Sequence, residues 1–213
     1  MQPWAQDLRD QPDLFAGTAP LARHAGTIAI LTGGFFTLAQ LLTFLTMNRA
    51  DLAETLSGWP YRLSSVALLL GFAGLAIAAV ALYERQAVKA GRIGAIGVCT
   101  ALLGTIFLGG DYWFETFAVP WYAVVLPDIL TIPGAGWLAV GGTTSYVLFT
   151  LGWLLFGIAS LRAKVYGRLT CIGVMLGAIV GFYAALPPYG AVLGVAILWT
   201  GIDTVRSRHT PSL

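Results

Sequence analysis

Residues 65–113 read SVALLLGFAGLAIAAVALY, then ERQAVKAGR, then IGAIGVCTALLGTIFLGGDYW. The first and last parts are apolar runs of about 20 residues, the length of helix that crosses roughly 30 Å of hydrocarbon. The middle part, residues 84–92, contains all the Lys and Arg of this stretch. This separation of apolar and basic residues predicts two membrane-spanning helices joined by a polar turn.

The composition of the whole chain also predicts that lipid, and not water, surrounds most of the protein. Of its 213 residues, 57% are hydrophobic and 10% are charged, and the mean hydropathy is +0.78. This leaves too little polar surface to cover a water-soluble domain. We therefore predict an all-α, polytopic membrane helix bundle. Its six transmembrane helices are expected at residues 28–47, 65–83, 93–113, 144–161, 169–186 and 189–205.

The basic residues predict the orientation of these helices, because Lys and Arg resist translocation across a membrane. Of the twelve Lys and Arg, only Arg49 and Arg62 fall on the second side of the predicted bundle. The other ten place the N-terminal segment 1–25, both basic turns and the tail 206–213 in the cytoplasm. The expected location is the cell membrane, as a multi-pass protein of a bacterial inner membrane with both termini inside.

Within the segment 114–143, residues 117–142 are apolar enough to suggest a seventh span. Three prolines and Asp128 interrupt this stretch, and a further crossing would reverse the charge bias of all the residues after it. We therefore expect an outer-face segment between helices 3 and 4. It is either interfacial or re-entrant, with its tryptophans and tyrosines near the lipid headgroups.

An internal repeat relates two parts of this single membrane domain, residues 65–113 and 144–186. Gly91-Arg92 followed by Ile96-Gly97-Val98 aligns with Gly167-Arg168 followed by Ile172-Gly173-Val174. We predict related helical hairpins, with chance similarity between glycine-rich helices as the alternative.

Small residues recur every fourth position in the repeat-related helices, and a similar pair begins the last span. Such stripes let helix backbones approach closely in lipid. They predict packing within one bundle or, alternatively, homodimerisation. The predicted helix-packing positions are Gly97, Ala101, Thr105, Gly173, Gly177, Gly181, Gly190 and Gly194.

A cluster of acidic and aromatic residues is the main candidate for a ligand site. Asp111 and Glu115 are four residues apart, which places two carboxylates on one face of a helix. Like charges repel there unless a cation, a proton or an arginine compensates. Nearby aromatic rings could add cation–π contacts. The predicted ligand-binding residues are Asp111, Trp113, Glu115, Trp121, Tyr122 and Asp128; the alternative is an interface belt whose carboxylates face water.

Several classes of function are disfavoured because the sequence lacks the residues that they require. The only histidines are His24 and His209, outside the predicted spans, and no Cys-x-x-Cys, glycine-rich phosphate loop or basic patch interleaved with aromatics occurs. We expect no metal, no cofactor and no nucleic-acid partner. Gln40 and the threonines at 32, 37 and 43 are expected to form hydrogen bonds between helices or, alternatively, to line a transport path.

Three functional hypotheses remain. The first is an integral membrane protein that binds or transports a small cationic or amphiphilic ligand through the acidic and aromatic outer face. The second is a non-catalytic accessory or assembly subunit that contacts the lipid bilayer and forms a homo-oligomer or part of a larger membrane complex. The third, which the sequence disfavours, is a membrane enzyme using the outer-face carboxylates.

Overall fold

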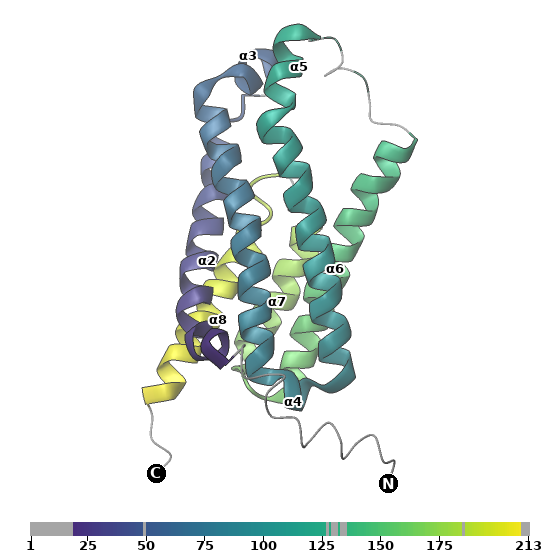
Figure 1. The fold of residues 1–213 in the computed structure, drawn as a ribbon. Helices are drawn as coiled ribbons and strands as arrows, with labels where there is room; N and C mark the ends of the chain where they lie inside the picture. Colours follow the sequence, from purple (N-terminus) through teal and green to yellow (C-terminus); the bar gives the residue numbers. More distant parts are fainter. Residues whose placement is uncertain are drawn as a thin grey trace.

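The computed structural model describes residues 19–48, 50–126, 128, 132, 136–184 and 186–209. Within these ranges the secondary structure is helical, which confirms the predicted all-α fold at that level. Figure 1 shows the helices as an elongated bundle. The elements are α2 (Ala19–Thr46), α3 (Leu52–Ser57), α4 (Trp59–Phe117), α5 (Val119–Val125), α6 (Trp137–Ala163), α7 (Arg168–Val180), the 3-10 turn η3 (Gly181–Tyr183) and α8 (Ala191–His209).

Helix α4 reverses its direction at Gly91. This residue has φ 57° and ψ −152°, a conformation that favours glycine. The ring of Phe72 stacks on that of Tyr112 with centroids 5.2 Å apart, so residues 59–90 and 92–117 lie antiparallel. These two parts are called the first and second halves of α4. The sequence-predicted turn between spans two and three is therefore a single-residue reversal.

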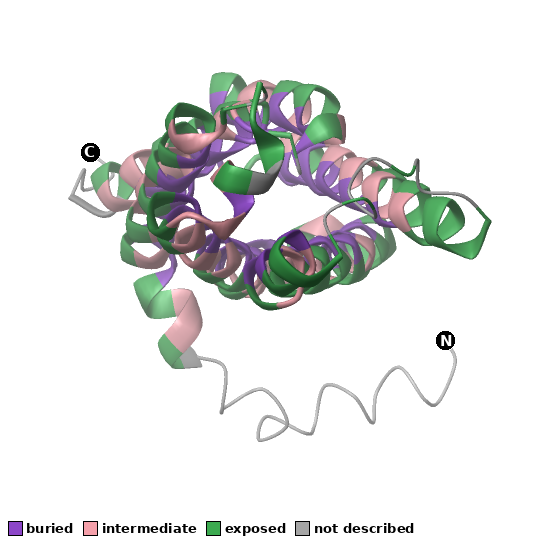
Figure 2. Ribbon diagram, turned by 90° about the horizontal axis from the view of Figure 1, so that it is seen from above, coloured by how far each residue is buried: buried purple, intermediate pink, exposed green. Residues whose placement is uncertain are grey.

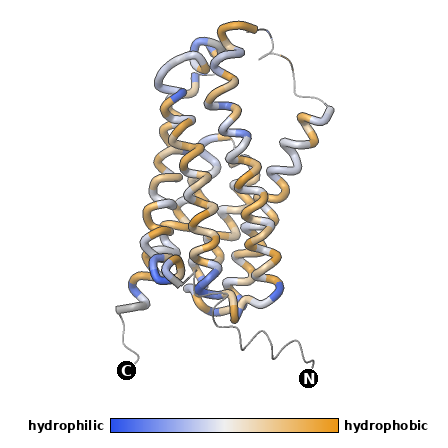
Figure 3. The backbone as a smooth tube through the Cα atoms, in the orientation of Figure 1, coloured by the Kyte–Doolittle hydropathy of each residue, from blue (hydrophilic) through white to orange (hydrophobic). Residues whose placement is uncertain are grey.

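The two ends of the bundle differ. One end, called the α5 end, contains α3 and α5 (Figure 1). The other, called the Gly91 end, contains the reversal of α4, the turn 164–167 and the C-terminal end of α8. Figure 3 shows the hydrophilic segments mainly at these two ends, with hydrophobic segments between them.

Three helical segments of the described chain are long and apolar enough to cross a membrane. They are Pro20–Thr46, Trp59–Val125 and Trp137–Ala163, of which the second includes both halves of α4. α7 has only 13 residues, or about 20 Å at 1.5 Å per residue. The number of crossings stays a prediction.

Some helix boundaries differ from those predicted. α2 begins at Ala19 and α6 at Trp137, nine and seven residues before the predicted spans. The extension of α2 includes Arg23 and His24, whereas that of α6 is apolar apart from Thr143 and contains two glycines. The fifth span was predicted to reach residue 186, but α7 ends at Val180 and η3 at Tyr183. Pro187 and Pro188 lack the backbone N–H that a longer helix would require.

The bundle is apolar on both its inner and its outer surface. Buried residues face the interior and exposed residues face outward (Figure 2). The outward face nevertheless carries large apolar side chains, such as Leu45 at 78%, Ile96 at 60% and Trp137 at 89% exposure. Water penalises such a surface and lipid does not. This distribution supports a membrane environment.

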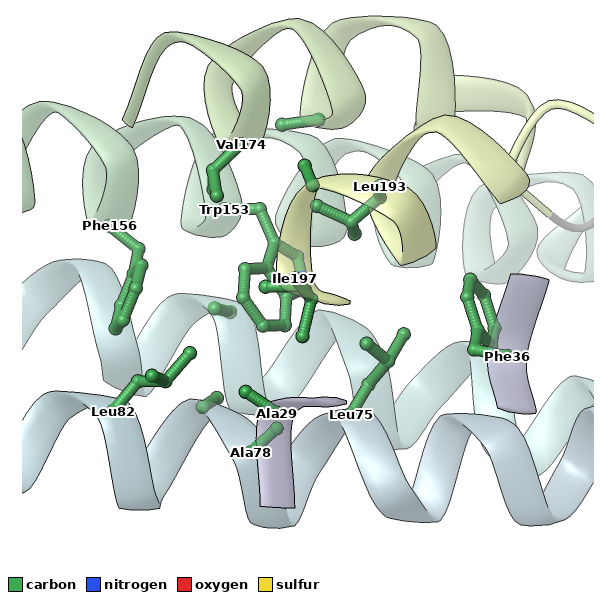
Figure 4. Packing of buried hydrophobic residues seen from close by; sticks show 14 of the residues in the cluster. Ala29, Phe36, Leu75, Ala78, Leu82, Trp153, Phe156, Val174, Leu193 and Ile197 are labelled. Carbon is green, nitrogen blue, oxygen red and sulfur yellow. The ribbon is translucent and has the colours of Figure 1, made fainter. Parts of the chain in front are cut away.

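Large side chains fill the interior midway along the bundle. Trp153, Leu75 and Ile197 converge there from three helices (Figure 4), and all three are fully buried. The Trp153 indole Nε1 donates a 3.1 Å hydrogen bond to Thr105 Oγ1, which joins α6 to the second half of α4. The middle of the bundle is thus packed with side chains.

Glycines permit close helix crossings. A Cβ at Gly97 would lie 2.9 Å from Phe156 N, and one at Gly177 would lie 2.6 Å from Leu193 Cα. Gly194 lies against Thr37, and Gly190 against Gln40. The remaining predicted positions are less crowded or are not glycines: Gly173 and Gly181 have neighbours at 3.6 Å and 3.4 Å, and Ala101 and Thr105 are buried.

The turn 164–167 at the Gly91 end is fixed by two hydrogen bonds from other parts of the chain. Tyr166 Oη donates to Leu82 O over 2.7 Å, and Gly167 N donates to Asp203 Oδ2 over 2.8 Å. Burial raises the pKa of the Tyr166 phenol well above its ordinary value of 10.0. Tyr166 therefore remains a neutral hydrogen-bond donor at physiological pH.

Candidate functional site

The second half of α4 brings Asp111 and Glu115 to the α5 end of the bundle. The helix continues without interruption to Phe117, so the two carboxylates lie one turn apart on one face, as their spacing predicts. Asp111 is exposed and Glu115 is half-buried. The pair therefore lies where the packed interior meets the bundle end.

A tyrosine from the first half of α4 binds Glu115. Tyr61 Oη donates a 2.7 Å hydrogen bond to Glu115 Oε2, and the Tyr61 side chain is only 2% exposed. Tyr146 of α6 and the buried Tyr112 lie within electrostatic range of both carboxylates. Three phenols therefore surround the two acids.

Neither carboxylate has a basic ion-pair partner among the residues that the structure describes. The groups that interact electrostatically with Glu115 are Asp111 and the three tyrosines, and none of them is a cation. Two anionic groups close together and partly removed from water favour the approach of a cation or a proton. The site can therefore bind positive charge.

The predicted tryptophans do not join the carboxylates. Trp113 is two residues from both Asp111 and Glu115, a separation that turns a helical side chain to the opposite face. Its ring contacts Phe117 at 5.6 Å instead. Trp121 is exposed and contacts Tyr122 at 5.1 Å. The sequence-predicted cluster is thus divided between two faces of α4 and the separate helix α5.

Tyr122 and Asp128 complete the predicted set. Tyr122 packs against Phe114, with ring centroids 6.0 Å apart, and not against the carboxylates. Asp128 is exposed, and its neighbours 127 and 129–131 lie outside the described residues. The aromatic part of the site is therefore made by tyrosines 61, 112 and 146, two of which lie far from Asp111 in sequence.

Separation from the turn does not predict the Tyr61–Glu115 contact. In an antiparallel hairpin that turns near Gly91, residues at similar separations from the turn lie opposite each other. Tyr61 is 30 residues before Gly91 and Glu115 is 24 residues after it. The difference of six residues corresponds to about 9 Å along a helix, so the sequence alone does not place these two side chains together.

The polar residues of α2 bind helix backbones. Gln40 Nε2 donates to Ala184 O over 2.8 Å, and Thr43 Oγ1 donates to Ala39 O over 2.9 Å and to Ser64 O over 3.4 Å. Thr37 and Thr32 likewise donate to backbone carbonyls. The bonds to Ala184, Ser64 and Gly74 join α2 to other segments, as the sequence predicts. The bonds from Thr43 to Ala39 O and from Thr37 to Gly33 O lie within α2.

No group of three or more potential metal ligands occurs in the part of the chain that was searched, which comprises the described residues. Comparison with protein-family models, curated proteins and solved structures finds no match to this chain. The function must therefore be argued from the geometry of the site.

Proposed function

We propose that this chain is a six-span inner-membrane protein, with both termini in the cytoplasm, that binds a small cationic amphiphile at Asp111 and Glu115. The observation that carries this proposal is the 2.7 Å hydrogen bond from buried Tyr61 to Glu115, with Asp111 one turn away and no basic ion-pair partner for either acid among the described residues.

The tyrosine fixes the position of one carboxylate without neutralising it. A neutral phenol donates a hydrogen bond to Glu115, so the negative charge remains available to a ligand. An arginine in the same position would form an ion pair and remove that charge. The arrangement therefore suits a cation that approaches from the exposed side of Asp111.

A neighbouring cleft supports an amphiphilic ligand. It has a volume of about 550 Å³ and lies between the second half of α4 and α6, lined by residues that include Phe107, Gly110 and Thr144. Gly110 directly precedes Asp111 in the helix. An apolar ligand body in this cleft would leave a cationic head near the carboxylates, where tyrosine rings can also contact it.

The arrangement of the bundle ends supports the proposed orientation. Arg92, Lys164 and Arg206 belong to segments at the Gly91 end, whereas both candidate carboxylates lie toward the α5 end. If the Gly91 end is cytoplasmic, as the distribution of Lys and Arg predicts, the ligand site faces outward.

Binding of tetraphenylphosphonium to the purified full-length chain in mild detergent tests the proposal. We expect saturable binding by the natural sequence, and at least about a tenfold loss of affinity in the double variant Asp111→Asn, Glu115→Gln. Glu54→Gln removes an exposed carboxylate from α3 and serves as the matched control. Equal affinity in the double variant and this control would disprove the proposed site.

A second candidate function is an accessory subunit that packs against another copy of the chain. An apolar groove of about 330 Å³ lies between α7 and α8, with Gly173 on its floor and Leu176 and Trp199 at its walls. Small residues in such a groove suit helix packing in lipid. A cysteine at Leu176 should then form a disulfide-linked dimer in membranes, whereas one at Leu103, an exposed position on α4, should not.

A further inference from the structure

A second groove at the α5 end contains an arginine and lies on a different face of α4 from the carboxylates. Its volume is about 490 Å³. Three elements line it: the first half of α4 with Trp59 and Arg62, the second half with Phe117, and α5 with Trp121 and Val124. Trp121, which was assigned from the sequence to the acidic and aromatic cluster, lines this groove instead.

Among the residues that the structure describes, Arg62 is the only charged one that lines this groove. Its Nε atom is buried and has no hydrogen-bond partner, and none of the hydrogen bonds of the described residues involves its guanidinium group. A buried donor without a partner carries a desolvation cost that a suitable acceptor would remove. The groove therefore lacks an anionic partner for Arg62.

We propose that this groove binds the headgroup of an anionic phospholipid, with Arg62 on the phosphate and an acyl chain along the apolar wall. A guanidinium group presents donors in a geometry that matches phosphate oxygens. Val66 and Val124 provide the apolar wall, and the exposed rings of Trp59 and Trp121 suit the headgroup region of a bilayer. The proposed ligand is thus a lipid that has both an anionic headgroup and an acyl chain.

The described lining residues also indicate which class of phospholipid headgroup the groove prefers. A zwitterionic headgroup brings a positive amine beside its phosphate, and none of the described residues that line this groove is acidic. An anionic headgroup such as phosphatidylglycerol adds no positive charge next to Arg62. This inference depends on the proposed membrane location but not on the site at Asp111 and Glu115.

Native mass spectrometry of the full-length chain tests the inference directly. The protein is exchanged into detergent with equal amounts of phosphatidylglycerol and phosphatidylcholine, and the ratio of bound lipids is measured. We expect the natural sequence to prefer phosphatidylglycerol and Arg62→Gln to lose about fivefold of that preference. Arg85→Gln removes a similarly part-buried arginine from the opposite end of the same half-helix and should retain it.

A second variant and a second probe complete the test. Val124→Trp fills the groove without changing its charge and should also reduce phosphatidylglycerol binding, whereas glycerol phosphate without acyl chains should not compete with the lipid. An unchanged lipid ratio in Arg62→Gln, or no preference in the natural sequence, would overturn the inference. Tetraphenylphosphonium binding should persist in Arg62→Gln, which keeps this result separate from the proposed cation site.

Discussion

The Tyr61 hydroxyl and the Glu115 carboxylate meet at 2.7 Å although 54 residues separate them in the chain. Their hydrogen bond joins the two halves of α4 at the end of the hairpin opposite Gly91, where Tyr61 also packs with Leu56 of α3 and Ala123 of α5. It also positions one of the two carboxylates of the candidate site. A single contact therefore links the closure of the hairpin to the geometry of the site.

Replacing Tyr61 with Phe should destabilise the protein moderately. The variant keeps the buried ring but removes the donor to Glu115, which should lower the free energy of unfolding by about 1 kcal/mol. The measurement is SDS-induced unfolding in mixed micelles. Tyr189→Phe is the control, because Tyr189 is half-exposed at a turn. Equal losses in the two variants would contradict the structural role of the Tyr61 hydroxyl.

Replacing Thr105 with Val should leave the buried Trp153 indole without its acceptor. Both side chains are at most 1% exposed, so water cannot replace the lost hydrogen bond. We expect a loss of about 1 kcal/mol in the free energy of unfolding. Trp153→Phe removes the other partner, so the two substitutions should be non-additive in a double-mutant cycle. Strict additivity would show that the bond contributes nothing.

Adding a methyl group at Gly104 should disrupt the crossing of α4 and α6. A Cβ there would clash with the backbone of Phe149, and no flexible side chain can move to make room. Gly104→Ala should lower stability by about 1–3 kcal/mol or prevent folding. Gly110→Ala, six residues further along the same helix, meets no atom within 4 Å and should be tolerated. Similar yields and melting temperatures for both variants would refute this crossing.

Cysteine labelling in intact cells should report the proposed orientation. In a variant lacking Cys99 and Cys171, a membrane-impermeant maleimide should label a cysteine at Glu54, in α3 at the α5 end. A cysteine at Lys164, in the exposed turn at the Gly91 end, should react only after the membrane is permeabilised. The reverse pattern would place the candidate site in the cytoplasm.

Hydrophobic runs and basic turns predicted the elements of this fold well. The reversal at Gly91 and the turn 164–167 occur where Arg and Lys interrupt apolar sequence, because charged side chains are costly in lipid. The ends of α2, α6 and α7 were less predictable. Hydropathy reports where the chain is apolar, whereas helices continue past that boundary or stop at glycine and proline before it.

The candidate site was predictable only in part. Spacing on a single helix was enough to place Asp111 and Glu115 together. Tyr61 and Tyr146 come from other helical segments, so their approach depends on register and packing that no local pattern contains. Proximity in sequence did not place Trp113 and Trp121 beside the carboxylates. Trp113 points to another face of α4, and Trp121 belongs to a separate helix, α5. From the sequence, Arg62 entered only the prediction of orientation. Its position in a groove depends on the packing of α4 and α5.

The turn after η3 lies beside Gln40, and α2 continues six residues beyond that point, or about 9 Å. Irregular backbone at such depth is tolerated only where protein or water can satisfy it. Here the protein satisfies it, because the fully buried Gln40 donates to Ala184 O. The chain after η3 is therefore tied at this depth to a side chain of α2.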